Sequence, residues 1–231
     1  MRRIAAFLLA LAALAGAPAY AANDGHTERF VSGVPLERVA GIATYGPFRV
    51  IDAQHAALVG ITDEQSPQEF AAMLHDFPAL RELDLVECPG TFDDHANLAL
   101  GRMIRRAGLD THVPSDGSVR SGAVELFIAG AHRSIDDGAR FAVHAWEDDE
   151  GFQATDYPAD APENVKYLAF YHDMGMQPAR AKAFYAMTNS VPNQQALWLN
   201  AAQMRGWVAT DGPAASAEPQ LAYLDLGRLL N

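Results

Sequence analysis

The chain has 231 residues and a formal net charge of −12, with 17 Lys and Arg residues against 29 Asp and Glu residues. This excess of negative charge argues against nucleic acid and anionic lipid as partners, because both need a basic face. Cys88 is the single cysteine, so no disulfide can form within the chain and stability has to come from packing.

The first 21 residues have the pattern of a cleavable export signal. Arg2 and Arg3 precede an apolar run over residues 4–15, and Ala19-Tyr20-Ala21 offers small residues at a cleavage site. The apolar run is too short for a stable membrane span. We therefore expect a periplasmic or secreted protein without membrane contact after cleavage. The expected segments are a signal peptide over 1–21, a flexible segment over 22–40, a folded domain over 41–210 and a C-terminal tail over 211–231.

The folded part begins with short strand patterns. Two apolar runs, 48–51 and 56–61, are joined by a polar turn and predict a hairpin. Ser66-Pro67-Gln68-Glu69 then predicts a helix start, with Ser66 and Glu69 as a capping box. Residues 80–88 predict a buried strand that ends with Cys88 as an inert, buried thiol, and Pro89-Gly90 predicts the turn that follows.

The next segment predicts a parallel crossover unit. Apolar residues over 92–107 have helical spacing, and Gly108 is the expected C-cap. A further strand pattern follows, so strand, turn, helix and strand form a right-handed unit. The remaining expectations are a strand over 109–113, a loop over 115–120, a helix over 121–129, a turn over 133–137, a strand over 139–146, an acidic loop or lid over 147–163, and helices over 163–174, 178–187 and 197–205.

Two residues in this part have the chemistry of acyl transfer. Ser121 stands at the head of an apolar helix pattern, and His144 ends a strand pattern. A serine, a histidine base and a backbone turn that holds an oxyanion are what this reaction needs. Each residue also has a simpler interpretation, since Ser121 can be a helix N-cap and His144 a strand histidine bonded to a neighbour.

Several motifs in this order resemble the Clp protease/crotonase superfamily, and most closely its predicted periplasmic Clp-protease-like proteins. The motifs are Pro89-Gly90-Thr91-Phe92-Asp93-Asp94-His95-Ala96, Leu98-Ala99-Leu100-Gly101-Arg102-Met103-Ile104-Arg105, Ser121-Gly122-Ala123, Ala129-Gly130, Arg133, and Gly138-Ala139-Arg140-Phe141-Ala142-Val143-His144. The resemblance covers roughly residues 41–208. It implies an α/β fold, a ClpP/crotonase-like stack of ββα units with a helical C-terminal part, so that residues 41–210 form a Clp-protease-like domain.

The resemblance also implies a serine hydrolase, most simply a peptidase. Ser121 is the implied nucleophile and His144 the general base, with an oxyanion hole from the N–H of Gly122 and an N–H of the turn at Gly90 and Thr91. No cofactor or metal is implied, the implied substrate is a peptide or small acyl compound, and homo-oligomers occur in the family.

The chain departs from the family pattern at three points. Val119 and Ala123 stand where close relatives often carry cysteines that flank the serine. Thr91 stands where the family turn has a second glycine, and no carboxylate stands at the expected position of the third triad residue. Four residues are candidates for orienting His144: Asn193, Gln195, Glu147 and Asp148. The sequence therefore leaves two functions open, an active peptidase or an inactive relative that binds peptides or assembles.

Overall fold

The structure, a computed structural model, describes residues 39–211. The expected signal peptide over 1–21, most of the flexible segment over 22–40 and nearly all of the tail over 211–231 lie outside the described residues. The boundaries expected for the domain therefore stay predictions. No helix within residues 39–211 is long and apolar enough to cross a membrane.

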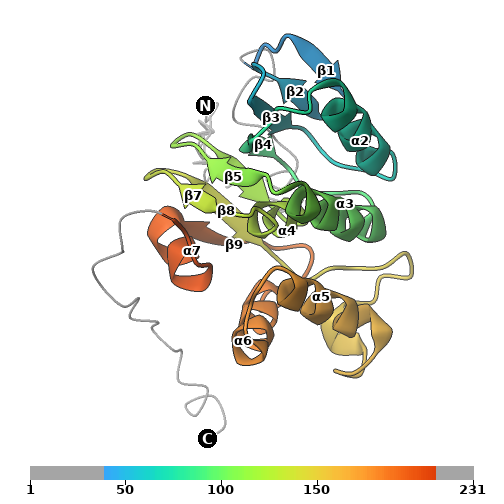
Figure 1. The fold of residues 1–231 in the computed structure, drawn as a ribbon. Helices are drawn as coiled ribbons and strands as arrows, with labels where there is room; N and C mark the ends of the chain where they lie inside the picture. The colour runs from blue at the N-terminus through green and yellow to red at the C-terminus, as the bar shows by residue number, and fades with distance from the viewer. Residues whose placement is uncertain (1–38, 212–231) are drawn as a thin grey trace, which may run out of the picture.

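A nine-stranded sheet forms the centre of the fold (Figure 1). Its strands are β1 (Ala43–Tyr45), β2 (Phe48–Val50), β3 (His55–Val59), β4 (Glu82–Cys88), β5 (Asp110–Val113), β6 (Ser118–Arg120), β7 (Arg133–Ile135), β8 (Arg140–Val143) and β9 (Leu197–Asn200). Strands β1 to β3 pair antiparallel, and β3 pairs β4 in parallel. The sheet then divides, because the first half of β4 pairs with β5 and the second half with β6. One branch continues to β7, and the other to β8 and the antiparallel β9.

Helices pack beside the sheet and form most of the C-terminal part. They are α2 (Ser66–Asp76), α3 (Asp94–Ala107), α4 (Ala123–Ile128), α5 (Pro162–Asp173), α6 (Pro178–Thr188) and α7 (Ala201–Trp207), with one 3-10 turn, η2 (Ala154–Asp156). Figure 1 shows α2, α3 and α4 on the same side of the sheet, with α5 and α6 packed together beyond them. This is the α/β stack of ββα units with a helical C-terminal part that the sequence predicts.

The elements with the clearest patterns form as expected. The hairpin of β2 and β3, the buried strand β4 and the helices α3, α5 and α6 are all present. Asp93 caps α3 by accepting the N–H of Ala96 at 2.9 Å, and Gly108 ends the helix with a left-handed φ of 67°. Glycine adopts this conformation without a Cβ penalty, which is why it closes the helix.

Four local expectations are wrong. The expected loop over 115–120 contains β6, and the expected turn over 133–137 contains β7. Each strand has only three residues, too few for an alternating pattern to be recognised. The expected helix over 197–205 begins as β9, which pairs with β8, and only then becomes α7. The helix expected from residue 121 begins at Ala123, so Ser121 precedes it.

The start of α2 is also different from the expected capping box. Gln65 is the N-cap residue and makes no side-chain cap, so Ser66 does not cap this helix. The Asp63 carboxylate takes that place, since its Oδ1 accepts the N–H groups of Gln65 at 3.0 Å and Ser66 at 3.1 Å. The side chain of Ser66 is buried and hydrogen-bonded to Asp63.

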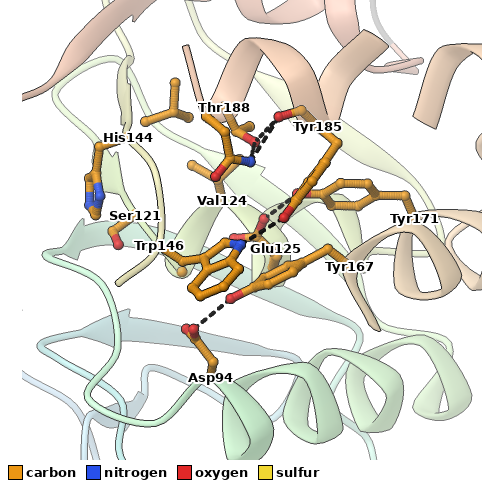
Figure 2. A pocket seen from close by; sticks show the side chains of 13 residues that line it. Asp94, Ser121, Val124, Glu125, His144, Trp146, Tyr167, Tyr171, Tyr185 and Thr188 are labelled. Atoms are coloured by element: carbon orange, nitrogen blue, oxygen red, sulfur yellow. Dashed lines mark hydrogen bonds between the residues drawn. The ribbon is translucent and has the colours of Figure 1, made fainter. Parts of the chain in front are cut away.

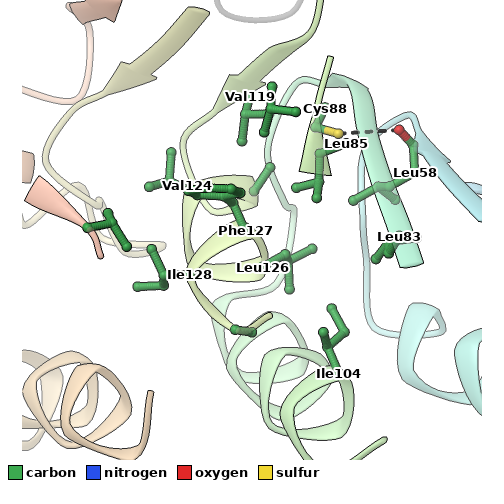
Figure 3. Packing of buried hydrophobic residues seen from close by; sticks show 14 of the residues in the cluster. Leu58, Leu83, Leu85, Cys88, Ile104, Val119, Val124, Leu126, Phe127 and Ile128 are labelled. Atoms are coloured by element: carbon green, nitrogen blue, oxygen red, sulfur yellow. Dashed lines mark hydrogen bonds between the residues drawn. The ribbon is translucent and has the colours of Figure 1, made fainter. Parts of the chain in front are cut away.

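The core lies between the sheet and the helices α3 and α4 (Figure 3). The rings of Phe127 and Phe141 pack together with their centroids 5.4 Å apart, which places α4 against β8. Cys88 is fully buried and its Sγ donates to the carbonyl of Leu58 at 3.3 Å. Burial raises the pKa of this thiol well above its usual range, so Cys88 is the inert thiol that the sequence predicts.

Candidate active site

Ser121 lies on a tight turn between β6 and α4. Its φ of 50° is the only positive value at a non-glycine residue within residues 39–211. The turn is held on both sides, because Ser121 N donates to Ala142 O at 2.8 Å and Ser121 O accepts from Val124 N at 2.9 Å. Such a backbone costs about 1–3 kcal/mol and persists only where the surroundings determine it. The N-cap interpretation is wrong, since Gly122 is the N-cap residue of α4 and no side chain caps it.

The turn at Gly90 packs directly against Ser121. Gly90 has a φ of 135°, and a Cβ placed there would lie 2.9 Å from the Cβ of Ser121 and 3.4 Å from its Oγ. Gly122 is equally close to the same turn, because a Cβ there would lie 2.6 Å from the Cγ2 of Thr91. The structure therefore brings Gly90, Thr91 and Gly122, all predicted for the oxyanion hole, to the Ser121 turn.

Thr91, which replaces a glycine of the family pattern, turns its hydroxyl toward the protein. Its Oγ1 lies 3.2 Å from Thr62 O and 3.1 Å from Asp93 O, and the Asp93 N–H donates to it at 3.2 Å. Thr62 and Thr91 also form a parallel backbone bridge. The threonine side chain therefore stabilises the turn through its contacts with the backbone of Thr62 and Asp93.

Asn97 is a site residue that the sequence reasoning missed. It is 2% exposed, and its Nδ2 donates to Gly122 O at 2.6 Å while its Oδ1 accepts from Thr62 Oγ1 at 3.1 Å. This amide connects the helix after the Gly90 turn to the residue after Ser121. A signal was present, because Asn97 stands on the apolar face of the predicted helix, three residues before Leu100 and seven before Ile104.

A buried ion pair fastens the two strand ends that carry these turns. Arg120, the residue before Ser121, contacts Glu87, which lies three residues before Gly90. Both side chains are buried, at 3% and 1% exposure. Removing one partner of such a pair is strongly destabilising, because the other charge stays buried. The pair therefore ties the end of β4 to the end of β6 and fixes the relative position of Gly90 and Ser121.

His144 follows β8, and its ring points toward Ser121 in Figure 2. Both residues line the same cavities. The Nδ1 of His144 lies 2.8 Å from Ala145 O. A carbonyl oxygen only accepts hydrogen bonds, so this contact requires the proton on Nδ1 and leaves the lone pair on Nε2. That is the tautomer that a general base for a serine needs.

Of the four candidates for orienting His144, only Asn193 lies beside its ring. The Asn193 Nδ2 is 3.4 Å from His144 Nδ1 and donates to Ala145 O at 3.0 Å. Both groups are donors, so Asn193 acts on the ring through the carbonyl that they share. The other three side chains have no hydrogen bond to His144 in residues 39–211: Glu147 accepts from Gln153 and Gln194, Asp148 accepts from Tyr157, and Gln195 bonds Pro192 through its backbone.

An open acidic cleft of about 560 Å³ runs past Ser121 and His144. The expected acidic loop forms one wall and is folded on itself, because Asp148 accepts the N–H groups of Glu150 at 3.0 Å and Phe152 at 2.9 Å. Lys166 is the one basic side chain of the cleft other than histidine, among the described residues. The acidic side chains that line it are Asp93, Asp94, Glu147, Asp148, Asp149, Glu150 and Glu163.

Comparisons with known proteins bear on the fold. No protein-family model matches the chain, and no curated protein matches it in sequence. Among solved structures, the chain is similar to a point mutant of ClpP1 from Listeria monocytogenes, with a TM-score of 0.49, 11% identity, and coverage of 68% of this chain and 88% of that one. It is also similar to a mutant of the membrane-bound stomatin-specific protease 1510-N in complex with a substrate peptide, with a TM-score of 0.42, 9% identity, and coverage of 65% and 72%.

Proposed function

We propose that the protein is an exported serine hydrolase, most simply a peptidase, with Ser121 as nucleophile and His144 as general base. The observation that carries the proposal is the meeting of three separate segments: a serine on a strained turn, a histidine in the correct tautomer and a glycine turn packed against the serine. Such a constellation is recognised by geometry and roles. Export follows from the expected signal over residues 1–21.

In this reaction the Oγ of Ser121 attacks the substrate carbonyl while Nε2 of His144 takes its proton. In this proposal, the N–H of Gly122 and an N–H of the Gly90 turn stabilise the oxyanion, which is where donors have the largest effect on rate. His144 then gives the proton to the leaving amine as the scissile bond breaks. Water hydrolyses the acyl-enzyme ester that remains and frees Ser121. Asn193 and the carbonyl of Ala145 hold the imidazole in place.

A peptide substrate is supported by the cleft. Its volume of about 560 Å³ lies in the range of binding sites for extended or drug-sized ligands, and it passes both Ser121 and His144. The competing function is an inactive relative that uses this cleft only to bind peptides or to assemble into oligomers. Labelling with a covalent probe separates the two.

The test is reaction of the mature protein with a fluorophosphonate at pH 8. The proposal predicts a mass increase of one phosphonyl group, located on Ser121, and no increase in Ser121→Ala. A wild-type protein that stays unlabelled while folded would favour the peptide-binding alternative. Labelling that persists in Ser121→Ala would place the nucleophile elsewhere.

A further inference from the structure

A second, narrow cavity opens beside Ser121 and His144 (Figure 2). Its volume of about 40 Å³ has room for roughly three water molecules. It extends along α4 toward Glu125, which lies four residues, about one helical turn, beyond Ser121. Trp146 and Tyr167 line it, and their rings stack with centroids 6.3 Å apart and an interplanar angle of 17°. The cavity is therefore a slot with aromatic walls that starts at the proposed nucleophile.

The aromatic donors around this slot are already in use within the protein. Tyr171 donates to Glu125 Oε1 at 2.7 Å, and Tyr167 donates to Asp94 Oδ2 at 2.5 Å. Trp146 Nε1 donates to the Tyr185 hydroxyl at 2.7 Å, and that hydroxyl donates to an amide oxygen outside the slot at 2.5 Å. A ligand therefore finds no aromatic N–H or O–H left to bind it.

The two polar side chains from α6 and its C-cap follow the same pattern. Thr188 Oγ1 donates to Tyr185 O at 3.0 Å, and Asn189 Nδ2 donates to the same carbonyl at 2.8 Å. The Oδ1 of Asn189 is buried and has no hydrogen-bond partner in residues 39–211. What the slot offers to a ligand is thus a set of acceptors: this oxygen and the carboxylates of Glu125 and Asp94.

The carboxylate of Glu125 is the deepest charged group of the slot. It is 7% exposed, and the one side-chain hydrogen bond that it receives within residues 39–211 comes from Tyr171. Among residues 39–211, no Lys or Arg side chain lines the slot. Lys166 lines the cleft outside it, with its Nζ 5.6 Å from the ring centroid of Trp146 and 5.2 Å from that of Tyr167. A buried carboxylate without a cation is rare, because buried charges are normally paired. A positive group that enters from the cleft would supply such a partner.

We propose that this slot is the subsite for the substrate residue next to the scissile bond, and that it takes a lysine-like side chain whose ammonium binds Glu125 and Asn189. The proposal rests on the proposed function for the position of the scissile carbonyl, and on the slot itself for the chemistry. An ammonium donates three hydrogen bonds and accepts none, which matches the carboxylate of Glu125 and the Oδ1 of Asn189. The unbranched methylene chain of lysine is apolar and suits the aromatic walls that Trp146 and Tyr167 give the slot.

The two carboxylates also exclude other substrates. An acidic side chain would meet Glu125 and Asp94 at close range, and a purely apolar one would leave the Asn189 oxygen without a donor and the Glu125 carboxylate without a positive partner. Arginine has a planar head that is wider than an ammonium, so the narrow slot discriminates against it.

The experiment measures binding, so it does not depend on catalysis. Full-length Ser121→Ala protein is titrated at pH 7.5 with three acetylated dipeptide amides that end in lysine, norleucine or arginine. Norleucine has the same carbon chain as lysine without the ammonium. We expect the lysine peptide to bind at least tenfold more tightly than the norleucine peptide and more tightly than the arginine peptide.

Two further variants in the Ser121→Ala background locate the effect. Glu125→Gln is expected to reduce the preference for lysine over norleucine to less than twofold. Asp94→Asn, which changes a partly exposed side chain instead of a buried one, is expected to reduce it about threefold. Glu64→Gln removes the same charge from an exposed position outside the slot and is expected to keep the full preference.

Equal affinity for lysine and norleucine, undetectable binding of the lysine peptide at 1 mM, or a preference that survives both Glu125→Gln and Asp94→Asn would overturn the subsite. Tighter binding of arginine would overturn the lysine assignment. A lysine preference in a wild-type protein that no fluorophosphonate labels would contradict the hydrolase and leave the subsite standing. A wild-type protein that the fluorophosphonate labels, but that binds the lysine and norleucine peptides equally, would support the hydrolase and contradict the lysine subsite.

Discussion

Two regions meet at the candidate active site, and the structure holds them in different ways. On the nucleophile side, Ser121 is fixed by a strained backbone, by Gly90 packed against it and by the buried pair of Arg120 and Glu87. On the base side, Nδ1 of the His144 ring lies 2.8 Å from the carbonyl oxygen of Ala145, to which Asn193 Nδ2 also donates. Changes on the first side should therefore affect folding and activity together, and changes on the second side activity alone.

The largest expected effect comes from the ion pair. Glu87→Gln leaves the guanidinium of Arg120 buried beside a neutral amide, so we expect the free energy of unfolding to fall by about 3–5 kcal/mol in urea denaturation. The matched control is Asp137→Asn, which breaks an ion pair with Arg205 in which Asp137 is 93% exposed. Exposed pairs are worth at most about 1 kcal/mol. Similar losses from the two variants would contradict a structural role for the buried pair.

Gly90→Ala tests whether the turn must touch the nucleophile. The added Cβ would lie 2.9 Å from the Cβ of Ser121 in a backbone with φ of 135°, so the turn has to move away from the oxyanion position. We expect the fluorophosphonate labelling rate to fall by about 10²–10³, as when an oxyanion donor is lost. Gly175→Ala is the control, because its φ of 90° is strained too but no atom lies within 4 Å of the added Cβ. Equal labelling rates in the two variants would show that the contact of the Gly90 turn with Ser121 does not affect the reaction.

Glu125, on the helix that follows Ser121, gives the nucleophile side a pH dependence. Burial raises the pKa of this carboxyl from 4.5 to about 7. Because the folded-state pKa is the higher one, the contribution of Glu125 to stability is fully present below about pH 4.5 and is lost as the pH rises to about 7. Over the whole range, ionisation of Glu125 lowers the free energy of unfolding by about 3 kcal/mol.

The measurement compares wild type with Glu125→Gln in urea at pH 5 and pH 7.5. We expect wild type to lose stability relative to the variant by about 2.4 kcal/mol between these two pH values, because part of the change lies below pH 5. Groups facing Glu125, namely Asp94, Tyr167, Tyr171, Tyr185 and His144, are the same in both proteins, so their titration largely cancels. A pH-independent difference would show that Glu125 stays neutral or stays charged throughout.

The smallest effect is expected on the base side. Asn193→Ala removes a donor from the carbonyl of Ala145, and we expect a labelling rate about tenfold lower with unfolding free energy changed by less than about 0.5 kcal/mol. Gln195→Ala, which changes a side chain without a hydrogen bond to His144 in the described chain, should leave the rate unchanged. A loss as large as that of His144→Ala would make Asn193 a full third member of the triad.

The same contrast explains how much the sequence could predict. Strand β4, helix α3 and the cap at Gly108 have strong local patterns, so they could be predicted. Strand β6 could not, because its three residues are buried between β4 and β8, and the charge of Arg120 is matched by Glu87, 33 positions away. Propensity carries no information about such a contact.

The site could be predicted only in part. The ordered motifs pointed to Ser121, His144, Gly90, Thr91, Gly122 and Asn193, and the structure places all six around one cavity system. The positive φ of Ser121 and the contact of His144 with the carbonyl of Ala145 depend on the folded chain, and no local pattern contains them. The slot around Glu125 needs tyrosines from α5 and α6, which are 42 or more positions away in sequence, so only the folded chain reveals it.

The most direct test of the account is the rate at which a fluorophosphonate labels Ser121 with and without the base. At pH 8, the proposal predicts stoichiometric labelling of wild type on Ser121 and a rate at least about 10²-fold lower in His144→Ala, because a general base contributes that much or more. Labelling of Ser121 at the same rate in both proteins, or none in either, would contradict a serine activated by His144.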